Sequence, residues 1–177
     1  MAVRRGLIQV YTGNGKGKTT AALGLALRAV GHDLRVIMFQ FLKGNITYGE
    51  LHSAKRLDPL LKIIPCGRDC FVKRQAPDPQ DVCLARNGLE LACRALRGED
   101  DYDIVILDEI NCAVDFGLLS AEEVLQCIEQ RRDGIEVILT GRGAPPALLE
   151  KADLVTEMTE VKHYYTKGVD ARIGIER

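Results

Sequence analysis

A glycine-rich segment with two lysines lies near the start of the chain, where residues 12–20 read TGNGKGKTT. Its glycines permit the tight turn in which successive backbone N–H groups converge on an anion. A helix that follows such a turn adds its positive N-terminal end. Lys18 is expected to contact phosphate oxygens, and the Thr19 hydroxyl suits Mg²⁺. This segment, called the phosphate loop below, predicts a nucleotide site formed by Gly13, Asn14, Gly15, Lys16, Gly17, Lys18, Thr19 and Thr20.

The spacing of the phosphate loop departs from the common pattern GxxxxGK[ST]. The residue five positions before Gly17 is Thr12, and the first glycine, Gly13, comes one place later. A glycine-rich turn that binds no ligand is the alternative interpretation. An apolar run before the loop, a helical stretch after it and the sequence GKTT together favour the phosphate site.

Three further groups of residues are candidates for the same site. Asp108 and Glu109 end the apolar run 104–109 (IVILDE), and they match the acidic element that reaches the magnesium of phosphate-loop proteins directly or through water. Arg142, within TGRGAPP, can fork onto phosphate oxygens, although an exposed turn arginine is an equal alternative. Arg28, near the end of the first helix, has two interpretations: it reaches a nucleotide, or it only caps the carboxyl end of that helix.

Strands and helices alternate along the chain, which predicts how these residues are positioned. Continuous apolar runs are typical of parallel strands that helices cover on both faces. The chain is therefore expected to form one domain, 1–177, with an α/β, three-layer, mostly parallel sheet of five or six strands and ligands at the carboxyl ends of the strands. The expected strands are 7–11, 36–42, 104–109, 137–141 and 153–158, with 61–65 as a further edge strand.

The expected helices carry recognisable signals at their ends. Residues 18–30 are rich in Ala and Leu, and 80–97 has apolar residues near helical spacing. Ser120 with Glu123 is a capping box, and Pro145-Pro146 opens a short helix. Residues 66–81 form the one long irregular loop, a length typical of functional or disordered segments.

Composition excludes several classes of protein. A net charge of −1 argues against a broad nucleic-acid surface. No apolar stretch approaches the roughly 20 residues of a membrane span, and the N-terminus MAVRRG lacks the apolar core of a signal peptide, so a cytoplasmic protein is expected.

The six cysteines do not resemble a disulfide framework. Cys83, Cys93 and Cys127 lie in helix-like stretches and are interpreted as small core residues. Cys66 and Cys70 flank the polar stretch CGRDC, where a metal pair is the alternative; two thiols alone do not close a metal site, which needs three or four ligands.

Several motifs taken together resemble the ATP:corrinoid adenosyltransferases of the phosphate-loop type. They are VYTGNGKGKTTAALGLALRAVGH, FQFLKG, LDEIN, VILTGRGAPPALLEKADLVTEM, and VKH followed by a GIE ending, and they span about residues 6–176. The resemblance implies a RecA-like P-loop fold, bound MgATP, and transfer of the 5′-deoxyadenosyl group to Co(I) of a corrinoid, with triphosphate released. It also implies a homodimer and a reductase that supplies electrons to cobalt.

The resemblance also implies roles for individual residues. The phosphate loop would hold the triphosphate, Thr19 and Glu109 would serve the magnesium, and Arg28 and Arg142 would assist on the nucleotide. Members often carry an aromatic GFTW loop over the lower face of the corrinoid. The corresponding region here reads GRDCFVKRQ, which retains Phe71 but has no tryptophan, and the KHYY segment replaces KHPF at His163. Phe71 and His163 are the candidate corrinoid contacts.

Adenosyl transfer offers a reason for the short phosphate loop. A kinase or ATPase exposes the γ-phosphorus, whereas here the reactive atom is C5′ and the whole triphosphate leaves. We interpret the short loop, with Lys16 between glycines, as gripping the leaving end while the ribose turns outward. Co(I) is itself a nucleophile, so the protein's tasks are positioning and stabilisation of charge by Lys16, Lys18, Arg142 and the metal. A P-loop ATPase or kinase and a non-catalytic nucleotide- or corrinoid-binding protein are the alternatives.

Overall fold

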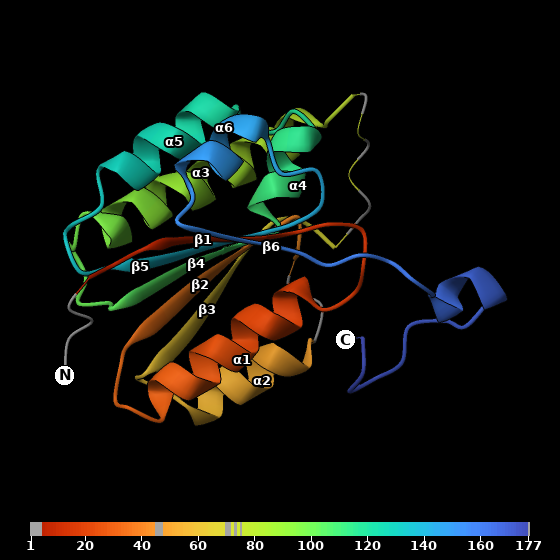
Figure 1. The fold of residues 1–177 in the computed structure, drawn as a ribbon, viewed down its shortest axis with the longest axis horizontal. Helices are drawn as coiled ribbons and strands as arrows, with labels where there is room; N and C mark the ends of the chain where they lie inside the picture. Colours follow the sequence, from red (N-terminus) through yellow and green to blue (C-terminus); the bar gives the residue numbers. More distant parts are fainter. Residues whose placement is uncertain (1–4, 45–47, 70–71, 73, 75, 177) are drawn as a thin grey trace.

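Six strands form a single parallel sheet between two layers of helices (Figure 1). The computed structural model describes residues 5–44, 48–69, 72, 74 and 76–176. The sheet order is β3-β2-β4-β5-β1-β6, which confirms the three-layer α/β prediction and places the 61–66 strand at an edge. The strands are β1 Ile8–Thr12, β2 Val36–Phe41, β3 Leu61–Cys66, β4 Ile104–Asp108, β5 Glu136–Thr140 and β6 Leu154–Glu157.

The helices divide between the two faces of the sheet (Figure 1). One face carries α1 (Lys18–Val30) and α2 (Gly49–Arg56), and the other carries α3 (Pro79–Leu96), α4 (Ile110–Asp115), α5 (Ala121–Glu129) and α6 (Pro146–Lys151). A 3₁₀ helix, η1 (Tyr164–Lys167), lies in the C-terminal tail. The sequence did not predict α2 and α4, because both are short. Among the described helices, none has the length and apolar character needed to cross a bilayer.

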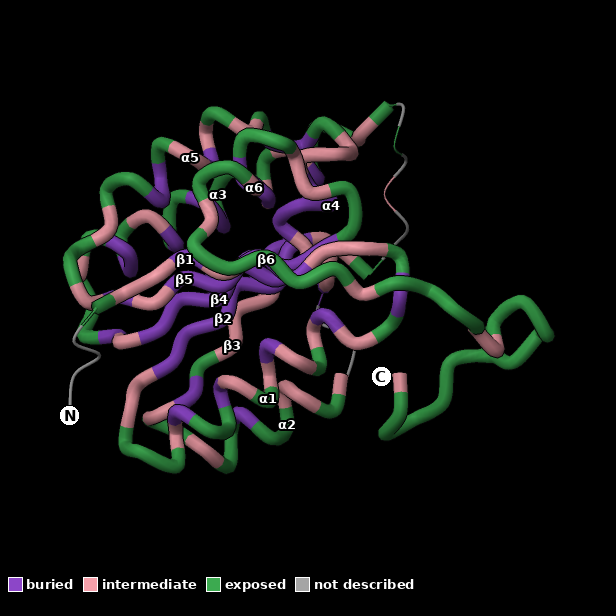
Figure 2. Tube along the Cα trace, in the orientation of Figure 1, coloured by how far each residue is buried: buried purple, intermediate pink, exposed green. Residues whose placement is uncertain are grey.

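Burial follows position in the sheet (Figure 2). Every residue of the central strands β2 and β4 is buried, as expected for strands covered on both faces. All four residues of β6 are exposed instead. The interpretation of 153–158 as a strand covered on both faces is therefore wrong, because β6 lies at the outer edge of the sheet, beyond β1.

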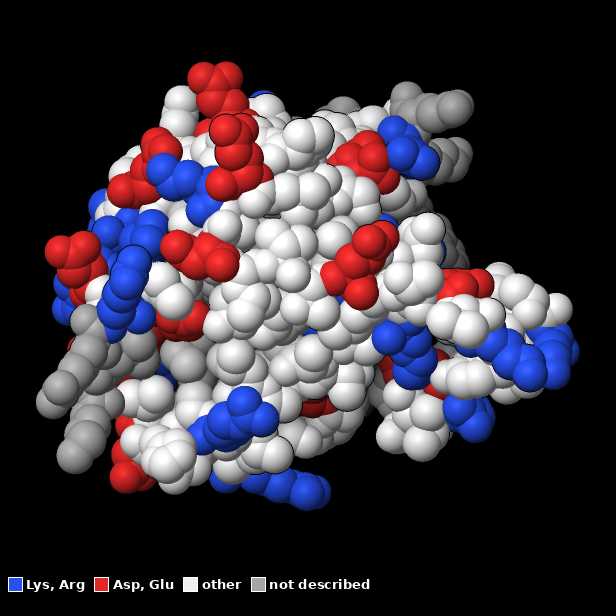
Figure 3. Space-filling view, in the orientation of Figure 1, with Lys and Arg blue, Asp and Glu red and all other residues white. Residues whose placement is uncertain are grey.

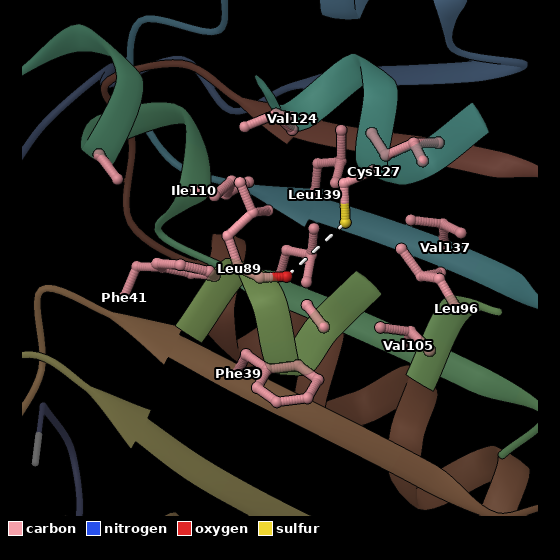
Figure 4. Packing of buried hydrophobic residues seen from close by; sticks show 14 of the residues in the cluster. Phe39, Phe41, Leu89, Leu96, Val105, Ile110, Val124, Cys127, Val137 and Leu139 are labelled. Atoms are coloured by element: carbon pink, nitrogen blue, oxygen red, sulfur yellow. Dashed lines mark hydrogen bonds between the residues drawn. The ribbon is translucent and has the colours of Figure 1, made fainter. Parts of the chain in front are cut away.

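The larger core cluster packs α3 and α5 against the sheet (Figure 4). A disulfide joins Cys93 of α3 to Cys127 of α5, which the sequence did not predict, and the Cys127 sulfur lies 3.8 Å from the carbonyl oxygen of Leu89. Cys83, expected in the core, is exposed. The side chains that meet in this layer include Phe39, Leu89, Leu96, Val105, Val124 and Leu139.

The capping box that begins α5 is formed as expected. The Ser120 hydroxyl accepts a hydrogen bond from the Glu123 N–H at 3.1 Å, and the Glu123 carboxylate accepts one from the Ser120 N–H at 2.7 Å. Ser120→Ala is expected to lower the free energy of unfolding by about 1 kcal/mol, measured by chemical denaturation. Ser120→Asp keeps an acceptor and should stay within a few tenths of a kcal/mol of the original protein. Equal stability of the Ala variant would show that this cap contributes nothing.

Candidate functional site

The candidate residues meet at the carboxyl end of the sheet, where its parallel strands finish. This end is called the edge of the sheet in this subsection. The phosphate loop follows β1, Lys43 follows β2, Glu109 follows β4 and Arg142 follows β5. Parallel strands bring their carboxyl ends to the same edge, so these segments become neighbours although they lie far apart in sequence. The blue C-terminal tail projects on the side where α1 begins (Figure 1).

The phosphate loop lies closely against the end of β6. Gly15 donates its N–H to the Met158 carbonyl oxygen at 2.6 Å. A Cβ atom at Gly13 would lie 2.5 Å from that oxygen, and one at Gly15 would lie 2.7 Å from it. Gly13 and Gly17 also have φ values of 92° and 122°, which favour glycine. The early glycines are therefore required by the neighbouring chain as well as by the turn.

The Lys18 side chain is buried and extends back over the phosphate loop. Its Nζ donates to the carbonyl oxygens of Gly13, at 2.7 Å, and Gly15, at 2.6 Å, and the residue is 6% exposed. Burial lowers the pKa of Lys18, and the negative charge of Glu109 opposes that shift. The two carbonyl groups hold the ammonium beside the amides that precede α1, where an incoming phosphate would meet it.

The carboxylate of Asp108 is completely buried and fully occupied by protein donors. Its Oδ1 accepts from the hydroxyls of Thr19, at 2.8 Å, and Thr140, at 2.7 Å. Its Oδ2 accepts from Lys43 Nζ at 2.9 Å and from Gln40 Nε2 at 3.3 Å. Four donors therefore satisfy this charge, and one of them, Thr19, connects Asp108 directly to the phosphate loop.

Glu109 begins α4 in a strained backbone conformation. Its φ of 60° is left-handed, which is uncommon outside glycine and is often found at functional sites. The hydroxyl of Thr140 accepts its N–H at 2.9 Å. This conformation turns the chain sharply after β4 and leaves Glu109 partly exposed at the edge of the sheet.

The turn that carries Arg142 is held by the first residues of α4. Asn111 Nδ2 donates to the Gly141 carbonyl oxygen at 3.3 Å, and the Arg142 N–H lies 3.2 Å from the Cys112 sulfur. Gly141 has a φ of 129°, and a Cβ atom there would lie 2.9 Å from the Cys112 nitrogen. These contacts fix the backbone of Arg142 while its side chain remains exposed.

The C-terminal tail adds a wall beside the phosphate loop. Glu176 accepts hydrogen bonds from Lys16 Nζ at 2.9 Å, from Arg172 and from the Tyr164 hydroxyl. The hydrogen bond from Arg172, followed by those from Tyr164 and Lys16, lowers the pKa of Glu176. Lys16 therefore contacts the tail in this structure, which its position between two glycines did not predict.

Two cavities open at this edge of the sheet, and they share Lys43, Glu109 and Arg142. The first has a volume of about 790 Å³ and the second about 660 Å³. The first is lined by the phosphate loop from Gly15 to Thr20 and by residues of α1, α2, the start of β3 and the tail. They are Leu23, Leu27, Gly49, Glu50, Ser53, Leu57, Leu61, His163, Gly174, Ile175 and Glu176. The second is completed by Asn14, Leu42, Val72, Arg74, Cys112, Asp115, Phe116 and Gly143.

The structure brings most of the predicted site residues together. Asn14 lies in the second cavity, whereas His163 lies in the first, beside the phosphate loop. Arg28 is exposed in the last turn of α1 and lines neither cavity. Phe71 and Cys70 fall outside the described residues.

Sequence reasoning missed Lys43. Its position directly after a buried strand is the signal that could have found it, because the phosphate loop stands in the same place after β1.

Burial should make the cysteines differ in reactivity. It raises the pKa of both the Cys66 and the Cys112 thiol to about 12, so at pH 8 only about one in 10⁴ of these thiols is ionised. Cys83 is exposed. Iodoacetamide at pH 8, followed by peptide mass spectrometry, should label Cys83 first and reach Cys66 and Cys112 only after unfolding. Equal labelling of Cys112 and Cys83 in the folded protein would contradict this burial.

The family model and the curated relatives that match this chain point to the same family. Residues 4–177 match the family model described as ATP:corrinoid adenosyltransferase BtuR/CobO/CobP. A corrinoid adenosyltransferase of Escherichia coli K12 is 40% identical over 172 residues, which cover 97% of this chain and 86% of that protein. A corrinoid adenosyltransferase of Pseudomonas aeruginosa is 37% identical over 172 residues, covering 97% of this chain and 84% of that protein.

A solved structure shares the fold at low sequence identity. The flagellar accessory protein FlaH from Methanocaldococcus jannaschii superposes with a TM-score of 0.57 and 15% identity, covering 88% of this chain and 72% of that one. At this identity, the likeness concerns the arrangement of the sheet and helices alone.

Proposed function

This chain belongs to the ATP:corrinoid adenosyltransferase family, and on that premise we propose how its residues transfer the 5′-deoxyadenosyl group of ATP to the Co(I) of a corrinoid and release triphosphate. The observation that carries the proposal is the pair of adjoining cavities. One contains the phosphate loop, and the other contains part of the loop that follows β3. A reaction between two large substrates needs such adjoining sites, because the reacting atoms must meet at their boundary.

The polyphosphate is proposed to lie in the first cavity, on the phosphate loop. Lys18, the N-terminal end of α1 and Arg142 supply positive charge there. The ribose then points toward the boundary with the second cavity, so that C5′ faces the cobalt. In this orientation the group that the loop binds most strongly is the one that leaves, which stabilises the charge that develops as the C5′–O bond breaks.

The residues at the phosphate loop fit a magnesium ion. The Thr19 hydroxyl and the partly exposed Glu109 carboxylate are the hard oxygen donors that Mg²⁺ prefers. Among the described residues, no three His, Cys, Asp or Glu side chains converge to hold a metal by themselves, so phosphate oxygens would complete the coordination. We propose that Asp108 acts by orienting Thr19. When bound, the ion would neutralise charge on the triphosphate.

The corrinoid is proposed to enter the second cavity. Val72 and Arg74 come from the loop that occupies the position of the family's aromatic GFTW loop. Arg74 forms a 2.7 Å ion pair with Asp115, which attaches this loop to the end of α4. Phe116 adds an aromatic surface to the same cavity. Apolar side chains and five charged ones share this lining, which suits a macrocycle with an apolar ring face and a rim of polar side chains.

Two protein partners are also proposed. The exposed edge strand β6 presents Leu154 and Val155, which are 44% and 47% exposed, and an open strand edge of this kind is suited to a second copy of the chain. Sedimentation at micromolar concentration would test the dimer.

Cobalt must also reach the Co(I) state, so a separate reductase is proposed as the electron donor. Figure 3 shows Lys and Arg side chains beside Asp and Glu side chains on the projecting tail and over the rest of this face, so the view shows no surface of a single charge for that partner.

Product analysis tests the proposed function. MgATP and a chemically reduced corrinoid should yield triphosphate and an adenosylcorrinoid in equal amounts. Chromatography measures the triphosphate, and the visible spectrum of the Co–C product measures the adenosylcorrinoid. ADP with phosphate would instead indicate an ATPase or kinase that acts at the γ-phosphorus. Binding of both substrates without turnover would indicate a non-catalytic binding protein.

A further inference from the structure

We propose that Lys43 is a catalytic residue, which donates a hydrogen bond to the triphosphate oxygen that leaves C5′. This inference rests on the proposed function, since it assigns the two cavities to the two substrates. Nothing in the phosphate-loop pattern requires a lysine after the second strand. The inference depends on where Lys43 lies and on which of its donors are engaged.

Lys43 lies at the boundary between the two cavities. It is one of the three residues that line both, with Glu109 and Arg142. If the polyphosphate occupies the first cavity and the cobalt the second, the C5′–O bond must cross this boundary. Glu109 is negative, so Lys43 and Arg142 are the shared residues with a positive charge to offer the departing oxygen.

The backbone that carries Lys43 is fixed on both sides. Leu42 has a φ of 61°, a left-handed conformation that is uncommon for a residue with a side chain. A Cβ atom at Gly67 would lie 2.7 Å from the Lys43 nitrogen, so the loop after β3 packs directly on this backbone. A strained conformation held by close packing at the end of a buried strand is typical of a residue that must be placed accurately.

The ammonium of Lys43 keeps hydrogen-bonding capacity for a substrate. Within the described part of the chain, Nζ donates one hydrogen bond, to Asp108 at 2.9 Å, and it lies 3.7 Å from the Glu50 carboxylate and 5.5 Å from the centre of the Tyr48 ring. A lysine has three N–H donors, and the side chain is 18% exposed toward the cavities. Burial lowers the pKa of Lys43, but its interactions with Asp108 and Glu50 outweigh burial and raise the pKa, so the group stays cationic.

The proposed step balances without a proton. The Co(I) electron pair forms the Co–C5′ bond, and the electron pair of the C5′–O bond passes to that oxygen, which leaves with the triphosphate. Cobalt is formally oxidised from Co(I) to Co(III). Negative charge grows on the oxygen only as its bond breaks, so a hydrogen bond from Lys43 strengthens in the transition state and acts mainly on kcat.

A purely structural role makes a different prediction. Lys43 would then serve only to compensate the buried charge of Asp108. Its loss would lower stability and disturb Thr19, which would weaken MgATP binding and leave the sensitivity to the leaving group unchanged. A nucleotide with sulfur in place of the bridging 5′ oxygen separates the two roles, because sulfur is a weak hydrogen-bond acceptor.

The experiment compares Lys43→Met with Lys62→Met, a matched control on an exposed position of β3. Lys43→Met should lower kcat with ATP by about 10²–10³-fold, with the Kd for MgATP changed by less than about threefold. With the sulfur analogue the loss relative to the original protein should shrink to about tenfold or less. Lys43→Arg should restore part of kcat, and Lys62→Met should resemble the original protein.

Each other outcome has a defined meaning. An unchanged kcat, or an equal loss with ATP and with the sulfur analogue, would overturn the role of Lys43. If Lys43→Met does not fold, Lys43→Met with Asp108→Asn, measured against Asp108→Asn alone, carries the same comparison because the buried charge is removed from both proteins. If the original protein forms no adenosylcorrinoid, the proposed function fails instead, which is a separate result.

Discussion

Lys18→Ala is expected to abolish MgATP binding and to lower kcat/KM for ATP by at least about 10³-fold. The substitution removes the buried cation of the phosphate loop, which the Gly13 and Gly15 carbonyl oxygens hold in place. It also leaves those two oxygens without this donor. A buried charge that meets a polyanion contributes far more than an exposed one, because water screens it less.

Lys55→Ala is the matched control for Lys18, because Lys55 is exposed at the end of α2. Isothermal titration of MgATP and steady-state turnover should show the control unchanged. Binding of MgATP to Lys18→Ala within about threefold of the original protein would mean that the phosphate loop does not hold the triphosphate in this chain. This variant tests the site and does not distinguish adenosyl transfer from attack at the γ-phosphorus.

Glu109→Gln is expected to lower kcat by about 10²–10³-fold and to raise the magnesium concentration needed for half-maximal rate. The substitution keeps the size of the side chain and removes the carboxylate at the boundary of the two cavities. Glu122→Gln, on the exposed side of α5, makes the same chemical change away from the site. An unaltered magnesium dependence, with full activity, would show that Glu109 neither binds the magnesium nor contributes to the reaction.

Most of the fold could be predicted from hydrophobic patterning. The runs 36–42 and 104–109 are continuous because both faces of β2 and β4 are covered, and the helix predicted at 18–30 is α1. The same pattern was misleading for β6, because an exposed edge strand can also be apolar. The length of a run therefore indicates a strand, but not whether that strand is central.

The position of each site residue depended on contacts that a single sequence does not contain. The residues that follow β1, β4 and β5 were found because they stand at strand ends next to glycines or acids. Lys43 was missed because its partner, Asp108, is distant in sequence. The contact between Lys16 and Glu176 joins the two ends of the chain and could not be inferred from either segment.

The short phosphate loop now has a structural explanation besides the proposed orientation of ATP. The Gly15 N–H is bonded to the Met158 carbonyl oxygen, so this amide is engaged by the protein rather than facing a ligand. The end of β6 lies close enough to exclude side chains at Gly13 and Gly15. The early glycines thus let the phosphate loop pack against the end of β6. Because Glu176 holds the Lys16 side chain, the residues from Gly17 onward remain for the triphosphate.

A crystal structure with MgATP and a cobalt(II) corrinoid would show how ATP is oriented between the two cavities. We expect the polyphosphate to lie between Lys18 and Arg142, with C5′ at the boundary formed by Lys43 and Glu109 and facing the cobalt. A terminal phosphorus that faces the second cavity, with the ribose directed away from it, would rule out adenosyl transfer in the proposed orientation.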